Sequence, residues 1–273
     1  MHPAFRFTQI AGTVVALLTF AAPLCRAQTL VGYYSFSQLG APISDLAASP
    51  ADMNQFGSPS YNQAAIPGQS FGATAALNGS SYWVTTGASK YTGLTNDFSV
   101  MAWINIPSTA GVSNHSTVIF GSEVGGGWGV GFQGQEQGAT QGQPYFVSYG
   151  IASYDLGAGS PGSVVPTNTW VNLAITKSST AGVTFYLNGV AVGTVAGATG
   201  SANPAAANNW YIGNGADLQR WFVGNIDEVR IYDGVLSQAQ IQSISAVPEP
   251  SAYAVLAGLA ALGIVMVRRR FAG

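Results

Sequence analysis

The feature that most constrains this chain is a period-two alternation of apolar residues in short segments. Between positions 98 and 106, Phe98, Val100, Ala102, Ile104 and Ile106 alternate with other residues. Successive side chains of a strand point to opposite faces of a sheet, so this pattern predicts a strand with one buried face. Comparable segments occupy residues 170–176, 183–187, 190–195, 210–213 and 222–232. The middle of the chain is therefore predicted to consist mainly of strands.

The connections between these strands carry Gly, Asn and Ser and show no long helical pattern. Asn188-Gly189 separates two of the strands and predicts a tight hairpin. A short helix is predicted at 237–243, with Ser237 as its N-cap. Strands joined by turns, without intervening helices, predict an all-β fold, an antiparallel β-sandwich.

The first 27 residues are predicted to be a signal peptide. Arg6 precedes a short apolar run, and small residues precede a cleavage site before Gln28. The alternatives are a buried N-terminal helix and a lipoprotein signal at Cys25, although Leu24 stands where a lipoprotein signal has a small residue. Cys25 is the only cysteine, so the mature chain would have no disulfide, no cysteine nucleophile and no thiolate metal site.

The C-terminus has three parts in a fixed order. Val247-Pro248-Glu249-Pro250 comes first, the uncharged run Ser251–Val267 follows, and Arg268, Arg269 and Arg270 come last. A helix of this length spans about 25 Å, which predicts one transmembrane helix. The arginines predict a cytoplasmic C-terminus and therefore a domain outside.

These three parts together resemble a PEP-CTERM sorting signal, and an ordinary C-terminal membrane anchor is the alternative. The resemblance implies an exosortase-type processing enzyme as partner, in a Gram-negative bacterium. The chain would be exported through the inner membrane, anchored there, and then moved to the cell surface or extracellular matrix. The predicted organisation is a signal peptide at 1–27, one domain at 28–245 and the sorting signal at 246–273.

The predicted domain is acidic but carries few charges. Between Gln28 and Val247 the chain has ten acidic and four basic residues, a net charge of −6. No cluster of basic residues is available to meet phosphates, which excludes nucleic acid as a partner. Neutral polymers fit this composition better.

Seven stretches of the predicted domain carry a family resemblance. They are residues 33–36, 76–84, 98–106, 170–176, 185–189, 211–213 and 222–232, the last followed by Leu236-Ser237. In this order they resemble the laminin-G-like members of the concanavalin A-like lectin/glucanase superfamily. The resemblance implies a jelly roll of two curved antiparallel sheets, one convex and one concave. It also implies that Trp103 and Trp170 pack within the sandwich.

Catalytic members of that superfamily are glycosidases with a pair of carboxylates in a Glu-x-Asp-x-x-Glu strand motif, which this sequence lacks. Asp227 and Glu228 are adjacent, so on a strand they would point to opposite faces. Glu228 and Arg230 would share a face and form an ion pair. The spacing of the remaining candidates, His115, Glu123 and Glu136, suggests no partner for them.

A calcium site of the family type is not supported by the sequence, and no cofactor is expected. The turn in which family members carry acidic residues is Asn78-Gly79-Ser80-Ser81-Tyr82 here, without an acid. The acidic residues of the predicted loops are expected to be solvated at the surface; these are Asp45, Asp97, Asp155 and Asp217.

Aromatic residues are the positive indication of binding. Trp128, in the glycine-rich segment 125–131, and Trp221 are predicted to be exposed and to stack on a ligand. The sequence therefore predicts an exported, non-catalytic module that binds carbohydrate or another surface polymer, in adhesion or biofilm structure. A divergent glycoside hydrolase of the same superfamily and a structural protein without a ligand are the alternatives.

Overall fold

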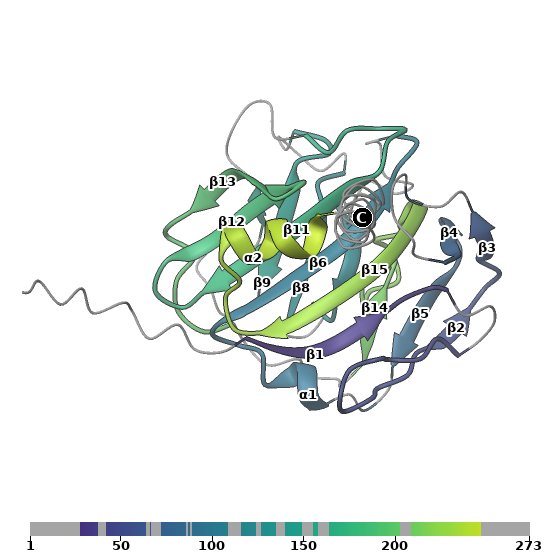
Figure 1. The fold of residues 1–273 in the computed structure, drawn as a ribbon, viewed down its shortest axis with the longest axis horizontal. Coiled ribbons are helices and arrows are strands. Elements are labelled where there is room, and N and C mark those ends of the chain that lie inside the picture. The colour runs from purple at the N-terminus through teal and green to yellow at the C-terminus, as the bar shows by residue number, and fades with distance from the viewer. Residues whose placement is uncertain are drawn as a thin grey trace, which may run out of the picture.

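The computed structural model describes residues 28–37, 42–63, 66, 72–85, 87, 89–108, 116–123, 127–134, 140–148, 155–157, 164–202 and 209–246. Two antiparallel sheets enclose one apolar core, which confirms the predicted all-β sandwich (Figure 1). The predicted signal peptide, the sorting signal from Val247 onward, His115 and Glu136 lie outside the described residues. Within these ranges, no helix has the length and apolar character needed to cross a membrane.

The first sheet is organised around its longest strand, β15 (Val223–Asp233), which pairs with β6, β4 and β1. In the described residues its spatial order is β13 (Val190–Val195), β12 (Gly182–Leu187), β11 (Val171–Ser178), β6 (Phe98–Asn105), β15, β4 (Thr74–Asn78) and β3 (Ser60–Gln63), with β1 (Thr29–Tyr34) also on β15.

The second sheet lies behind the first in Figure 1. Its described strands follow the order β10 (Asp155–Gly157), β9 (Pro144–Ser148), β8 (Trp128–Phe132), β7 (Thr117–Gly121), β14 (Trp210–Ile212), β5 (Tyr82–Thr85) and β2 (Asn54–Phe56). Every pairing in both sheets is antiparallel, so the strands can be joined by short turns, as the Gly and Asn signals predicted.

Two local predictions are confirmed. Asn188 and Gly189 adopt φ angles of 50° and 75° in the tight hairpin between β12 and β13. The predicted helix is α2 (Gln238–Ser245), and Ser237 caps it in a reciprocal arrangement with the side chain of Gln240. A one-turn helix, α1 (Ser89–Thr92), was not predicted.

Helix α2 packs on the outer face of the first sheet, away from the core (Figure 1). Leu236 and Ile241 contact Met101 of β6, Ala174 of β11 and Tyr186 of β12. The helix therefore covers one part of that face with a small apolar cluster of its own.

The core between the sheets is dominated by aromatic rings. Trp128 stacks on Phe98, with 4.3 Å between ring centroids, and lies 4.8 Å from Trp210. Trp210 in turn stacks on Phe120. Trp83 is also fully buried there. Such large rings contribute much of the apolar area that a chain without disulfides needs for stability.

Candidate functional site

The outer face of the first sheet carries two tryptophans beside α2. On β6, Ala102 and Ile104 belong to the core, so Trp103 between them points to the outer face. On β11, Val171 pairs with Ile104 and Asn172 pairs with Trp103, which places Trp170 beside the same face. The prediction that Trp103 and Trp170 pack within the sandwich is therefore wrong, because strand alternation turns them away from it.

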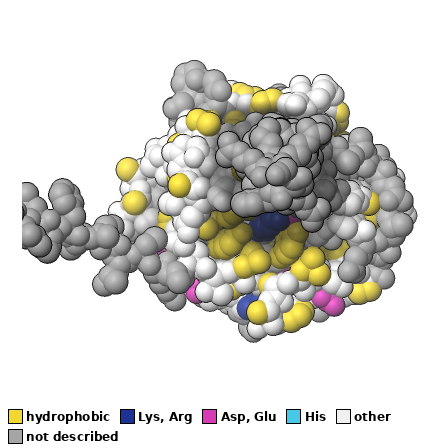
Figure 2. Space-filling view, viewed as in Figure 1, with side chains coloured by type: hydrophobic (Ala, Val, Ile, Leu, Met, Phe, Trp, Pro, Cys, Tyr) yellow, Lys and Arg dark blue, Asp and Glu magenta, His cyan; other side chains and the backbone are white. Residues whose placement is uncertain are grey.

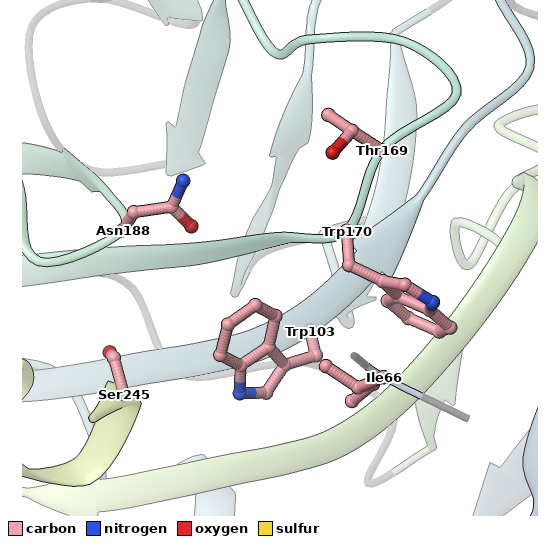
Figure 3. A pocket seen from close by; sticks show the side chains of 6 residues that line it. All are labelled: Ile66, Trp103, Thr169, Trp170, Asn188 and Ser245. Atoms are coloured by element: carbon pink, nitrogen blue, oxygen red, sulfur yellow. The ribbon is translucent and has the colours of Figure 1, made fainter. Parts of the chain in front are cut away.

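These two tryptophans line a hollow of about 270 Å³, which we call the tryptophan pocket. Figure 3 shows Trp103 in its middle, with Trp170 and Ile66 on one side and Asn188 and Ser245 on the other. Trp103 is only 7% exposed and forms the floor, whereas Trp170 is half-buried. The residues that line the pocket are Ile66, Trp103, Thr169, Trp170, Asn188 and Ser245.

The ring nitrogen of Trp103 is a buried donor without a hydrogen-bond acceptor in the structure. It points to the side of the pocket where Ser245 lies (Figure 3). A buried donor left without a partner costs about 1–3 kcal/mol, so an acceptor entering the pocket would relieve that cost. This feature makes the pocket a candidate binding site.

The polar wall of the pocket is held by a hydrogen-bond network. The side-chain oxygen of Asn188 accepts a 2.8 Å bond from the backbone N–H of Asn172. The Ser245 hydroxyl is 2.8 Å from the side-chain oxygen of Asn172 and 2.7 Å from the carbonyl oxygen of Ile241. The network fixes the hairpin turn and the end of α2 against β11, so the wall is preorganised.

A second hollow, of about 400 Å³, lies farther along β6 on the same face. Asn105 and Asn225 face each other across β6 and β15 and line it together with Asn168, which precedes Thr169 of the tryptophan pocket. We call it the asparagine hollow. None of the described residues that line either hollow is charged.

The described charges of this face are engaged in one cluster on β1 and β15. Glu228, at a bulge with a φ of 54°, accepts from the Tyr33 hydroxyl at 2.9 Å and forms an ion pair with Arg230, which confirms the predicted pair. Arg230 also lies over the Tyr33 ring, 4.7 Å from its centroid. Figure 2 shows basic atoms in a hollowed part of this face, among mainly apolar and uncharged side chains.

Asp227 lies next to this cluster and opposite Trp103 in the strand register. It is fully buried, and one carboxyl oxygen accepts from the backbone N–H groups of Phe36 and Glu228. Burial, reinforced by the charge of Glu228, raises the pKa of Asp227 to about 7. Its contacts are structural, and it does not line either hollow.

The two tryptophans predicted to bind a ligand lie elsewhere. The expectation of an exposed ring is wrong for Trp128, which is 1% exposed, packs in the core and donates its ring N–H to the Leu94 carbonyl at 2.7 Å. Trp221 is half-buried beside the second sheet, 5.8 Å from the Tyr82 ring. Phe56, 56% exposed, stacks on the same Tyr82 ring.

The loop acids form internal contacts. The expectation of a solvated Asp45 is wrong: it is 3% exposed, pairs with Lys90 and accepts from the backbone N–H of Tyr33. Asp97 accepts from Ser179, and the side chain of Asp155 lies outside the described residues. Within the described ranges, no three histidine, cysteine or acidic side chains gather closely enough to hold a metal.

Glu123 is a buried acid beside Arg220. It follows β7, and its carboxyl group lies over the second sheet where Gly121 and Gly129 carry no side chain; a Cβ on either would be 3.1–3.2 Å from Oε2. The residue is 1% exposed, neither carboxyl oxygen accepts a hydrogen bond of good geometry, and Arg220 Nε lies 3.5 Å away. Burial raises the pKa of Glu123 to about 7, although the nearby backbone N–H groups of Glu123 and Ala216 and the charge of Arg220 oppose the shift.

Sequence reasoning did not identify this environment because Gly121, Gly129 and Gly215 leave no hydrophobic pattern. A Cβ on Gly215 would collide with Oε1 of Glu123. Asp217 forms a second ion pair with Arg220, at 3.2 Å, so the expectation of a purely solvated acid is wrong there too. The cluster lies beside the second sheet, on the opposite side of the sandwich from the tryptophan pocket.

Two family models match the sequence. The model of the concanavalin A-like lectin/glucanases superfamily matches residues 78–242. The model of the PEP-CTERM protein-sorting motif matches residues 246–270. No curated protein matches the chain.

Several solved structures share the fold over 80% of this chain. Domain 4 of AbnA, a GH43 extracellular arabinanase from Geobacillus stearothermophilus, in complex with arabinotriose, is 22% identical with a TM-score of 0.59, and 99% of that chain is covered. The receptor binding domain of botulinum neurotoxin mosaic serotype C/D is 14% identical with a TM-score of 0.58. The binding domain of Paraclostridial Mosquitocidal Protein 1 is 15% identical with a TM-score of 0.56. This chain spans about half of the latter two, 50% and 52%, and at these identities the likeness concerns the fold alone.

Proposed function

Since the chain belongs to the concanavalin A-like lectin/glucanases superfamily and carries a PEP-CTERM sorting motif, which indicates an exported protein of a Gram-negative bacterium, we propose that its tryptophan pocket binds a neutral carbohydrate polymer at the cell surface. The protein would act there in adhesion or in the extracellular matrix, without catalysis.

The observation that carries this proposal is the pair of tryptophans around an uncharged, polar-walled hollow. Sugar rings present apolar C–H faces that pack on aromatic rings, and their hydroxyls exchange hydrogen bonds with amides and hydroxyls. Trp103 and Trp170 supply the rings, and Asn188, Thr169 and Ser245 supply the polar groups. The Trp103 ring nitrogen would donate to a sugar oxygen.

The asparagine hollow supports a polymer rather than a single sugar as the ligand. It continues along β6 from the tryptophan pocket, and Asn105, Asn168 and Asn225 would meet the hydroxyls of the next units. The related fold of AbnA domain 4, solved with arabinotriose, makes arabinan a natural first polymer to test.

A non-catalytic role is supported by the chemistry of the pocket. Glycosidases need two carboxyl groups on either side of the scissile bond, about 5–9.5 Å apart. Asp227, opposite Trp103 in the strand register, accepts from backbone N–H groups, and Glu228 contacts the Tyr33 hydroxyl and Arg230. They are not among the residues that line the pocket.

The sorting motif supports a second partner, an exosortase-type enzyme that processes the C-terminus. Val247-Pro248-Glu249-Pro250 and the arginines 268–270 would be its recognition elements. The run between them would anchor the precursor in the inner membrane until it is processed.

The experiment is a binding assay on immobilised neutral polysaccharides, including arabinan, with and without calcium, that also measures released reducing sugar. Trp103→Ala and Trp170→Ala are each expected to weaken binding about tenfold, equivalent to 1.4 kcal/mol. Trp221→Ala, on the second sheet, is the matched control and should bind normally. Loss of binding in Trp221→Ala alone would move the site to the other sheet. Released sugar would favour a hydrolase. A wild-type protein that binds none of the polymers would overturn the proposal.

A further inference from the structure

The tryptophan pocket lies where the chain leaves the domain. Ser245, the last residue of α2, lines the pocket, and the next residue, Ala246, is exposed and has left the helix. Its φ of −63° and ψ of 119° are extended, close to the polyproline II region. The chain therefore turns into an extended conformation directly beside the two tryptophans.

The residues that follow are Val247-Pro248-Glu249-Pro250. Each proline fixes its own φ near −65°, and each disfavours a helical conformation in the residue before it. Four consecutive residues are thus biased towards polyproline II. That helix has three residues per turn, so Val247 and Pro250 would share one apolar face, with Glu249 directed elsewhere.

Aromatic-lined grooves are the recurring binding sites for proline-rich segments, because a polyproline II helix is already ordered before it binds. Proline lacks an N–H but keeps its carbonyl, so such a segment offers acceptors with few donors to satisfy. The Trp103 ring nitrogen is a buried donor in need of an acceptor. The uncharged pocket with two indole rings matches these requirements.

The distance requirement is also met. Pro248 follows Ser245 by three residues, a reach of about 10 Å for an extended chain. Ser245 itself already lines the pocket, so the segment needs no unfolding of α2 to enter it.

We propose that Val247–Pro250 binds in the tryptophan pocket of its own chain and competes there with the carbohydrate polymer. The competition rests on the proposed function; the docking does not. The occupant is tethered by one residue, and a short tether gives an effective concentration of mM order. A polymer would therefore have to displace the sorting segment from the pocket as long as that segment is present.

The docking is tested by the indole N–H signals of the full chain in solution NMR, in a detergent without a sugar head group. Trp103→Phe and Trp170→Phe assign two of the signals from the six tryptophans. In Pro248→Gly/Pro250→Gly these two signals should shift and the Trp103 indole hydrogen should exchange faster. The signals of Trp83, Trp210 and Trp221 should stay in place. Glu249→Gln is the matched control and should leave all six unchanged.

Unmoved Trp103 and Trp170 signals in the double variant would overturn the docking, whatever the polysaccharide results. The competition is tested by polymer affinity, which should be about tenfold higher in Pro248→Gly/Pro250→Gly than in the wild-type full chain. Shifted signals with equal affinities would overturn the competition and leave the proposed function standing. Shifted signals with no polymer bound by any form would leave the docking standing and refute the proposed function.

Discussion

Replacement of Glu123 by Gln is expected to make the protein more stable at neutral and alkaline pH. The carboxyl group lies over Gly121 and Gly129, its oxygens accept no hydrogen bond of good geometry, and Arg220 Nε is 3.5 Å away. A buried carboxylate with so little compensation costs free energy when it ionises. Gln keeps nearly the size and shape of the side chain, removes the ionisation, and replaces one carboxyl oxygen by an NH2 group.

The size of the effect follows from the pKa of Glu123, which burial raises from the ordinary 4.5 to about 7. Such a raised pKa corresponds to about 3 kcal/mol between the two protonation states. Because the folded-state pKa is the higher one, this group's stabilising contribution is complete below pH 4.5 and is lost as the pH rises through 7. Asp227, whose pKa burial also raises to about 7, loses its contribution over a similar range.

The assay is urea unfolding of wild type and Glu123→Gln between pH 4.5 and 8.5. The two free energies of unfolding should agree at pH 4.5 and differ by up to about 3 kcal/mol at pH 8.5, with the variant more stable. Glu228→Gln is the comparison: burial raises the pKa of that carboxyl group too, but Arg230 and the Tyr33 hydroxyl oppose the shift as direct partners, so its gain in stability at pH 8.5 should be smaller than that of Glu123→Gln. Parallel pH curves for wild type and Glu123→Gln, or a less stable variant at pH 8.5, would refute the reasoning.

Three other substitutions test the packing of the sandwich by urea unfolding at pH 7. Arg230→Ala leaves the buried Glu228 carboxylate without its cation and should lower the free energy of unfolding by about 3 kcal/mol. Arg230→Lys keeps the positive charge and should lose less. An unchanged free energy of unfolding in Arg230→Ala would mean that the ion pair contributes no net stability. Gly131→Ala places a Cβ onto the Thr117 carbonyl oxygen and should lower the free energy of unfolding by roughly 1–3 kcal/mol. Gly93→Ala, with open space around it, should be close to neutral. Equal effects of the two substitutions would contradict the close approach of β7 and β8 at Gly131. Ser237→Ala removes the N-cap of α2 and should cost about 1 kcal/mol, so wild-type stability would argue against the capping box.

The strands were predictable because their alternation is local. Every second residue from Phe98 to Ile104 is apolar. In the structure this segment is strand β6, and those apolar residues lie in the core. The same alternation also places Trp103 on the outer face, where the structure has it. The family resemblance implied the opposite, so the physical pattern in this sequence was the better guide to that residue.

Trp128 could not be placed in the same way because its neighbours are glycines. Trp128, Val130 and Phe132 alternate with Gly129 and Gly131, but a glycine has no side chain to mark the opposite face as polar, so the pattern does not say whether the apolar face meets the core or a ligand. The face of β8 is instead fixed by close approach to β7, where a Cβ on Gly131 would overlap Thr117. That constraint acts between two strands, so it cannot be predicted from the sequence of β8 alone.

The acids were mispredicted for a related reason. Asp45 is buried by partners that are distant in the sequence, namely Lys90, Tyr91 and the Tyr33 backbone. A loop acid followed by small residues has the local signature of a solvated turn, and only the tertiary fold supplies the donors that stabilise it inside.

The end of α2 connects the pocket with the sorting motif through one constraint on the backbone. A proline at position 248 disfavours a helical Val247, and Ala246 is already extended, so the first proline of the motif helps to set where α2 ends. Alanine at 248 and 250 would remove that stop and favour a longer α2, which would change the pocket wall at Ser245. Glycine removes the polyproline bias without favouring a helix, and it is therefore the substitution that separates docking of the segment from a change in the pocket itself.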